Sequence, residues 1–293
     1  MKHLFDFILE NTVVGFRKNA TNYGECIILA GGPGSGKGFI KNKIDANFRT
    51  YDVDELKKRY IRMLNKGKLN DELKEFDFKN PEDVTELHMR VKQHGWKEKQ
   101  INLIFRNKYN TDKKASNSKI LPNLLFDRVS GEIEDITEIA TRAKTLGYNV
   151  TVVWVLCNIE TAKVNNRIRE RYVDENTVLI PNHKAAYATM TSLFNNRYPN
   201  FNDYIDNGWI GYSAGYGRKL SGKYANSPIV KINKDESGNW IFNQVELVDK
   251  FLEEIQPYDI GKIKKDLSSA SKKLKTRAKN FVKEENLKLD DAV

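Results

Sequence analysis

A glycine-rich segment followed by a lysine carries the most specific chemistry in the sequence. Residues 31–37 are GGPGSGK and fit the pattern G-x-x-x-x-G-K, between the apolar run CIILA and the segment GFIKNKIDANF. Glycines there let backbone N–H groups turn toward phosphate oxygens without interference from Cβ, and the lysine reaches the β- and γ-phosphates of a nucleoside triphosphate. The candidate ATP-binding residues are Gly31, Gly32, Pro33, Gly34, Ser35, Gly36, Lys37 and Gly38.

Gly38 departs from the usual pattern, in which Ser or Thr follows the lysine and its hydroxyl binds Mg²⁺. Phe39 offers no hydroxyl either, and Ser35 is the nearest alternative. Because Mg²⁺ keeps several waters in most nucleotide sites, carboxylates can hold it through its hydration shell. An inactive, degenerate loop is the alternative, which the intact Lys37 disfavours.

Three aspartates stand where expected strands end. Asp52 and Asp54 lie in YDVDELKKR, where a short strand gives way to a helix, and Asp127 ends the apolar run LLFD. The carboxyl ends of parallel strands meet at one edge of a sheet, which is also the edge of the phosphate loop. A carboxylate at position 52 or 54 can accept the proton of an attacking hydroxyl, and Asp127 and Asp52 are the candidate Mg²⁺ ligands.

The side-chain directions of these residues follow from the expected elements. Alternation along a strand predicts that Asp52 and Asp54 point the same way while Val53 packs inward. One of the two aspartates could instead cap the following helix. Arg128, beside Asp127, is either an exposed charge or a phosphate ligand.

Arginines in NRIRERY are candidates for a lid over the transferred phosphate. If the segment is helical, Arg167 and Arg171 share a face one turn apart, and Arg169 does not. Two guanidinium groups on one face can neutralise a phosphoryl group during transfer, and Arg197 is a candidate to join them from the next helix. The alternative is an ordinary solvated basic face.

Apolar runs and helical segments alternate along most of the chain. Strands are expected at CIILA, before Val53, at ILPNLLFDRV and at NVTVVWVLC, and SPIVKIN and NWIFNQV flank a hairpin turn. Helices are expected between them, including one or two over residues 81–107 broken around Gly95. This order predicts an α/β protein with a doubly wound parallel sheet. With the phosphate loop, the carboxylates and the arginines above, we expect a kinase-like P-loop domain over residues 1–258 with a helical lid at about 160–200.

Residues 259–293 differ in composition from the rest. Apolar residues at three- and four-residue spacings predict an amphipathic helix, and residues 262–283 contain nine lysines or arginines and one aspartate. Either the helix is an appended arm that binds a polyanion, or it packs on the domain with a solvated lysine face.

Bulk composition narrows the class of protein. The chain has 293 residues and a net charge of +10, which favours an anionic partner. Its two cysteines have no metal-ligand spacing, the N-terminal segment contains Asp6 and Glu10, and the longest apolar run is VTVVWVLC. We therefore expect no secretory signal, no membrane span and a cytoplasmic location.

Residues 204–224 interleave tyrosines and a tryptophan with arginine, lysine and glycine. Aromatic rings beside cations can stack bases and follow a phosphate backbone, although a glycine-rich surface loop with ordinary tyrosines fits equally well. The segment favours a nucleotide or nucleic-acid acceptor over a free sugar.

These motifs together resemble, in their order, the small phosphate-loop kinases grouped with zeta toxins and polynucleotide kinases. The resemblance covers about residues 25–200 and rests on LAGGPGSGKG, DVDELK, the strand ending in Asp127, VTVVWVLC and NRIRERY. It implies phosphorylation of a hydroxyl with ATP and Mg²⁺, with Asp54 as general base, Lys37 as loop lysine, and Arg167 and Arg171 as lid arginines. It departs at Gly38, and nothing in it corresponds to residues from about 202 to 293. The chain as a whole also resembles bacteriophage proteins, which implies the host cytoplasm.

Two functions of different classes follow. One is a kinase that transfers the γ-phosphate of ATP to a hydroxyl of a nucleotide, a nucleic acid or a nucleotide sugar. The other is a nucleotide-binding module with little catalysis, tethered to nucleic acid or a partner protein by its basic C-terminal helix.

Overall fold

The computed structural model describes residues 24–41, 48–106 and 121–289. The helix expected within residues 1–24 and the polar segment NKYNTDKKASNSK fall outside these ranges, apart from Gly24. Within the described residues, no helix is long and apolar enough to span a membrane.

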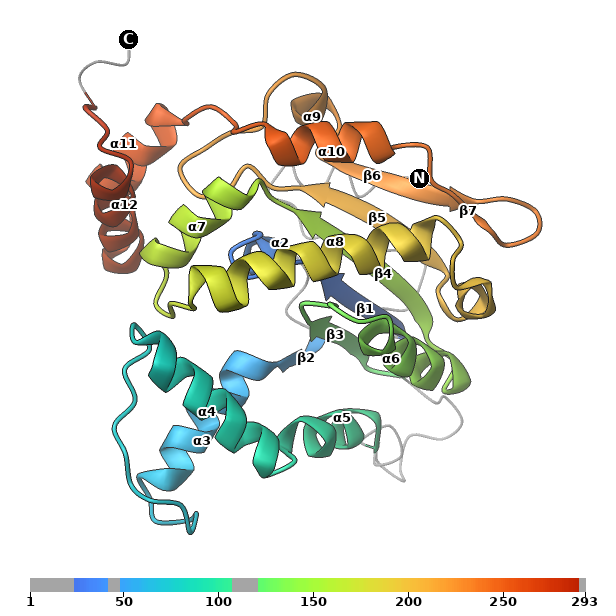
Figure 1. Ribbon diagram of the computed structural model, residues 1–293, viewed down its shortest axis with the longest axis horizontal. Helices are drawn as coiled ribbons and strands as arrows, with labels where there is room; N and C mark the ends of the chain where they lie inside the picture. Colours follow the sequence, from blue (N-terminus) through green and yellow to red (C-terminus); the bar gives the residue numbers. More distant parts are fainter. Residues whose placement is uncertain (1–23, 42–47, 107–120, 290–293) are drawn as a thin grey trace.

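A seven-stranded sheet forms the centre of the molecule, with the strand order β2-β3-β1-β4-β5-β6-β7 (Figure 1). The first five strands in this order are parallel, and β6 and β7 are antiparallel additions at one edge. The strands are β1(Glu25–Ala30), β2(Phe48–Asp52), β3(Asn123–Asp127), β4(Asn149–Leu156), β5(Asn207–Tyr212), β6(Ile229–Lys234) and β7(Trp240–Ile241). The expected parallel α/β sheet and the C-terminal hairpin are confirmed, and β5 is a strand that the sequence did not indicate.

Both faces of the sheet are buried, as the continuous apolar runs require. On β1, Cys26 and Ile28 belong to the larger core under the helices, whereas Ile27 and Leu29 belong to a second core on the opposite face. This alternation fixes β1 at the centre of the sheet, so the loop that follows it starts from a rigid position.

The helices fall into groups around this sheet. α6 and α8 lie across the face of the sheet that is nearest the viewer in Figure 1, and α3, α4 and α5 form a separate lobe beyond β2. The break expected near Gly95 separates α4 from α5. The helices are α2(Lys37–Lys41), α3(Val53–Leu64), α4(Pro81–Gln93), α5(Trp96–Arg106), α6(Glu134–Thr145), α7(Ile159–Ile168), α8(Ile180–Phe194), α9(Gly222–Asn226), α10(Val245–Glu253), α11(Ile260–Ser268) and α12(Lys272–Glu284), with the short segments η1(Glu175–Leu179) and η2(Pro199–Tyr204).

The basic C-terminal segment forms two helices, α11 and α12, rather than the single helix expected. Both pack on the domain, because Ile263 and Phe281 are buried together with Tyr216. Tyr216 also donates a hydrogen bond to Asp266, with 2.8 Å between the oxygens. Of the two alternatives, the structure therefore supports packing on the domain with the lysines in solvent.

Candidate active site

The phosphate loop lies directly after β1 and turns on three glycines. Gly31, Gly34 and Gly36 have φ of 147°, 77° and 101°, in the region that disfavours every residue with a side chain. Within the described residues, the backbone N–H groups of Gly34, Gly36, Lys37 and Gly38 have no hydrogen-bond acceptor. Several unpaired N–H groups in one turn of backbone form a binding site for an anion.

Neighbouring elements pack so closely on the loop that its glycines leave no room for a Cβ. A Cβ at Gly32 would lie 2.2 Å from the ring of His183 on α8, and one at Gly36 would lie 2.3 Å from Oγ of Ser213. Asn165 on α7 donates a hydrogen bond of 2.8 Å to the carbonyl of Gly34. The loop is thus held by α7, by α8 and by the segment after β5.

Lys37 begins α2 and folds its side chain back over the loop. Its Nζ donates hydrogen bonds to the carbonyls of Gly31 and Gly32, at 2.5 and 3.0 Å, and lies 4.0 Å from a carboxylate oxygen of Asp127. Burial lowers the pKa of Lys37, and Asp127 partly opposes that shift. The ammonium therefore lies within the loop, between the turn of backbone and the end of β3.

Asp52 and Asp127 are opposite each other at the ends of adjacent parallel strands, in the register of β2 and β3. Asp52 accepts hydrogen bonds from Nζ of Lys41 at 2.6 Å and from the backbone N–H of Asp54 at 2.9 Å. Burial opposes ionisation of Asp52, but these two donors outweigh it and bring its pKa below the ordinary value. Burial raises the pKa of Asp127, against the effect of Lys37.

This pair of carboxylates fits a magnesium ion that is also bound to nucleotide phosphates. Such ions take one or two protein carboxylates and keep several waters, and within the described residues no group of three or more His, Cys, Asp or Glu side chains could hold a metal. Ser35 does not fit the role, since it is 1% exposed and its Oγ is buried, with no hydrogen-bond partner in the part of the chain that the structure describes. The open position is Gly38, where a Cβ would meet nothing within 4 Å.

Asp54 lies in the first turn of α3 and forms an ion pair with Arg171, with 2.6 Å between the carboxylate and guanidinium atoms. The prediction that Asp52 and Asp54 point the same way as residues of one strand is wrong, because β2 ends at Asp52 and α3 begins at Val53. Asp52 is the aspartate that caps the helix. Asp54 remains half exposed beside the loop, where a hydroxyl can approach it.

The arrangement expected for the lid arginines is also wrong. α7 ends at Ile168, so Arg167 and Arg171 do not share a helical face. Arg167 instead forms a two-bond ion pair with Glu175, at 2.7 and 3.0 Å, and lies near Glu284 of α12. The guanidinium group of Arg167 is therefore paired with carboxylates of the chain rather than directed at the phosphate loop.

Arg169, rather than Arg167, is the arginine of this segment that lies near the phosphate loop. It follows the end of α7, and its charge acts on Lys37 at the loop. Burial and the neighbouring Arg171 lower the pKa of Arg169 to about 10. Its Nη2 is buried without a partner among the described residues. A buried guanidinium with an unpaired donor next to the loop lysine suits a phosphate oxygen.

Residues that the sequence analysis missed complete the site. The Nε2 atom of His183 is 2.8 Å from the carbonyl oxygen of Pro33, 150 residues away in sequence, and Lys41 neutralises Asp52. The helical spacing after the loop was the only signal in the sequence that could have indicated Lys41 as a site residue. No local pattern indicates that His183 contacts the loop.

Two further candidates, Arg128 and Arg197, have no role at the phosphate loop in this structure. Arg128 donates to the carbonyl of Asp135 at 2.9 Å and lies 3.3 Å from its carboxylate, so it fixes the start of α6. Arg197 follows α8, whose last residue, Phe194, is about 16 Å along the helix from His183 at 1.5 Å per residue. Arg197 therefore does not reach the phosphate loop.

The aromatic residues of segment 204–224 are largely interior. Tyr212, Tyr216 and Tyr224 are all less than 9% exposed, and Tyr212 and Tyr224 both pack on Phe251. The expected base-stacking surface is therefore absent at these three tyrosines, which build the core beneath α10, α11 and α12.

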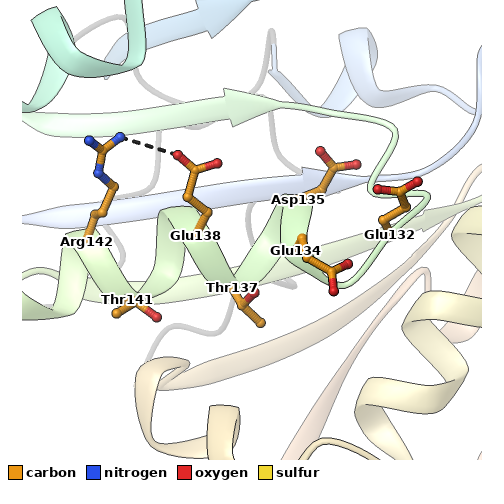
Figure 2. A pocket seen from close by; sticks show the side chains of 7 residues that line it. All are labelled: Glu132, Glu134, Asp135, Thr137, Glu138, Thr141 and Arg142. Atoms are coloured by element: carbon orange, nitrogen blue, oxygen red, sulfur yellow. Dashed lines mark hydrogen bonds and ion pairs between the residues drawn. The ribbon is translucent and has the colours of Figure 1, made fainter. Parts of the chain in front are cut away.

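A shallow pocket on α6 is a separate feature. Figure 2 shows it lined by acidic residues that include Glu132, Asp135 and Glu138, the last in an ion pair with Arg142. It contains neither the loop lysine nor the paired aspartates. Its negative charge makes it unsuited to phosphate.

Comparisons with known proteins give structural similarity alone. No protein-family model matches the chain, and curated proteins give no match either. A solved structure from the PezAT chromosomal toxin-antitoxin system of the human pathogen Streptococcus pneumoniae is 12% identical, with 93% of this chain and 91% of that chain covered and a TM-score of 0.44. The AvrRxo1-ORF1:AvrRxo1-ORF2 complex with ATP is 13% identical, with 88% and 76% covered and a TM-score of 0.48. Since both TM-scores are below 0.5, we infer function from the geometry of this chain itself.

Proposed function

We propose that this chain is an ATP-dependent phosphotransferase that phosphorylates a hydroxyl group. The proposal rests on one observation: the phosphate loop with Lys37, the carboxylates Asp52 and Asp127, and the accessible Asp54 all lie at one edge of the sheet. Open α/β sheets bind their ligands at this edge. A site that only bound nucleotide would not need a third carboxylate, the half-exposed Asp54, beside the loop.

Each group has a chemical role in this reaction. The loop N–H groups and Lys37 bind the β- and γ-phosphates, and Lys37 leaves the loop carbonyls to do so. Mg²⁺ held by Asp52 and Asp127 would neutralise charge on the phosphates. Arg169 neutralises the oxygens of the phosphoryl group while it is transferred.

Asp54 is the proposed general base. The acceptor oxygen forms a bond to the γ-phosphorus, the bond from that phosphorus to the β–γ bridging oxygen breaks, and ADP leaves. The proton of the hydroxyl passes to Asp54. Arg171 orients the Asp54 carboxylate in the structure, and the acceptor must take up part of that interaction when it binds.

The proposed acceptor is a nucleotide, a nucleic acid or a nucleotide sugar. The net charge of +10 and the cationic side chains near Asp54 support an anionic molecule. Tyr212, Tyr216 and Tyr224 do not support a nucleic acid, because they are buried.

Transfer of labelled phosphate from ATP to a panel of oligonucleotides, nucleotides and nucleotide sugars tests the proposal. Asp54→Asn should reduce transfer at least about a hundred-fold, the usual contribution of a positioned base, and keep ATP affinity. Lys37→Ala should weaken ATP binding. Normal ATP binding by the Lys37→Ala protein would contradict the placement of the triphosphate.

A nucleotide-binding module tethered to a polyanion is the second candidate. Lysines at 262, 264, 265, 272, 273, 279 and 283 are exposed on α11 and α12 and form a basic surface. If the wild-type protein binds ATP and a polyanion but transfers no phosphate to the whole panel, this second function is the better one.

A further inference from the structure

Lys57 is a buried cation that the proposed reaction does not use. It lies on α3 three residues after Asp54, so the two side chains share a face of the helix. Lys57 is 2% exposed, and within the described residues no hydrogen bond or ion pair satisfies its ammonium group. Its Nζ is not among the atoms that are fully shielded from solvent. An anionic ligand can therefore reach this ammonium group, which has no acceptor among the described residues.

The surroundings of Lys57 are cationic. The charges that act on it come from Arg171, Asp54, Lys97 and Arg169, and Asp54 is the only anion among them. Asp54 is already paired with Arg171. The local excess of positive charge is therefore left for a group from outside the chain.

Lys97 of α5 also lies near Lys57, and it contacts His88 of α4. Its Nζ lies 3.0 Å from Nε2 of His88, and His88 is close enough to Lys57 and Arg171 for their charges to act on it. Burial lowers the pKa of His88 to about 4, so its ring is neutral and accepts the hydrogen bond from Lys97. His88 thus holds a second ammonium beside Lys57 without removing its charge.

We propose that Lys57, with Lys97 beside it, binds a phosphate group carried by the acceptor molecule. This inference rests on the proposed phosphotransfer. A hydroxyl that donates its proton to Asp54 lies within about one helical turn of Lys57, or about 5 Å, so a phosphate on the same molecule can reach it. In the proposed reaction the phosphates of ATP are bound by Lys37 and the loop N–H groups.

Lys57→Met tests this directly, because it keeps the length of the side chain and removes the charge. Steady-state kinetics with the acceptor found in the panel should show a KM for that acceptor raised about ten-fold or more, the loss expected for one charge-assisted hydrogen bond, and an unchanged KM for ATP. Lys58→Met is the matched control on the same helix, since Lys58 is partly exposed and contacts Glu55 and Glu170. Lys57→Arg should recover part of the lost affinity.

A binding measurement decides the matter even when no acceptor is found. The full chain, saturated with Mg²⁺ and a non-hydrolysable ATP analogue, should melt at a higher temperature in the presence of inorganic phosphate. This increase should persist in Lys58→Met and disappear in Lys57→Met, whose circular dichroism verifies the fold. If Lys57→Met does not fold, Lys97→Met takes its place.

The outcomes separate the two proposals. If the wild-type protein binds no nucleotide, the phosphotransferase fails, and the phosphate-dependent shift is then measured in Lys37→Ala without nucleotide. If phosphate stabilises Lys57→Met as much as wild type, or if the KM for a phosphorylated acceptor does not change, the assignment of Lys57 is overturned while the kinase stands.

Discussion

At the scale of single residues, Gly38 decides how a metal can be held. The position is exposed, and a Cβ there meets nothing within 4 Å, so the absence of a hydroxyl is not forced by packing. The two aspartates at the ends of β2 and β3 are the remaining candidate ligands. Asp127 is the less tightly paired of the two, because Lys37 lies 4.0 Å from it and donates its hydrogen bonds to the loop carbonyls, whereas Lys41 lies 2.6 Å from Asp52.

We predict that Gly38→Thr folds normally and changes the Mg²⁺ concentration needed for nucleotide binding by less than about two-fold, because in the proposed site the two carboxylates hold the ion. Asp127→Asn should raise that concentration at least about ten-fold, which corresponds to about 1.4 kcal/mol. Titration of Mg²⁺ at fixed ATP analogue measures both variants. A large gain of Mg²⁺ affinity in Gly38→Thr would show that the carboxylates hold it poorly.

Gly32 is required for a steric reason. Its Cβ would lie 2.2 Å from the ring of His183, whereas a Cβ at Gly38 has open space. We predict that Gly32→Ala weakens ATP binding at least about ten-fold and that Gly38→Ala does not. Calorimetry with an ATP analogue measures both. Gly32→Ala combined with His183→Ala should recover part of the loss, and no recovery would place the clash elsewhere.

At the scale of elements, the start of α8 and the end of α7 close over the phosphate loop. His183 and Asn165 contact the carbonyls of Pro33 and Gly34. Lys79, before α4, donates a hydrogen bond of 2.8 Å to the carbonyl of Arg167. The segment that carries Arg169 and Arg171 is therefore tied both to the loop and to the α3–α5 lobe.

This closure should be sensitive to acid. Burial lowers the pKa of His183 to about 4, partly opposed by its contact with Pro33, whereas an unfolded histidine titrates near 6.5. The unfolded state binds more protons between these values, so the free energy of unfolding falls as pH falls from about 6.5 to about 4, by at most about 3 kcal/mol for this residue.

Denaturant unfolding at pH 7 and pH 4.5 measures the effect. The loss of stability between these values should be smaller in His183→Gln than in wild type, because glutamine keeps a donor toward Pro33 and does not titrate in this range. His88→Gln should show a similar reduction, since burial also lowers the pKa of His88 to about 4. An unchanged pH dependence in both variants would contradict the prediction.

At the scale of the whole molecule, the C-terminal helices belong to the packed structure. Phe281 is 1% exposed and contacts Tyr216, and the carboxylate of Glu285 forms an ion pair with Arg218, with 2.5 Å between the atoms. Residues 259–293 are therefore part of the packed domain rather than the appended arm that was one of the two expectations. A deletion of residues 259–293 should lower the free energy of unfolding as well as any polyanion binding.

Point variants separate packing from charge. Phe281→Ala should lower the free energy of unfolding by about 3 kcal/mol, as large-to-small substitutions in a core do. Lys272→Glu with Lys273→Glu should leave thermal stability almost unchanged, because both side chains are exposed, and should weaken binding to heparin or DNA. Chemical denaturation and a binding titration at fixed salt measure the two effects. If Phe281→Ala were as stable as wild type, α12 would not contribute to the packed core and would be an appended arm.

Sequence alone determined the features that depend on neighbouring residues. The glycines and lysine of the phosphate loop, the apolar run of β1, the helix break near Gly95 and the hairpin of β6 and β7 are local patterns of backbone conformation and burial. The end of an apolar run also indicated Asp127 correctly as an edge carboxylate, because buried strands of a parallel sheet end at the same edge.

Tertiary structure decided what depends on contacts between distant segments. α7 could have continued to Arg171 by its spacing, but it ends at Ile168, and Arg167 pairs instead with Glu175 and Glu284. The same holds for Tyr216, whose ring and hydroxyl are satisfied by α11 and α12, and for His183 on Pro33. A side chain takes the partner that lowers its free energy most, and partners that lie outside its own helix or strand leave no periodic trace in the sequence.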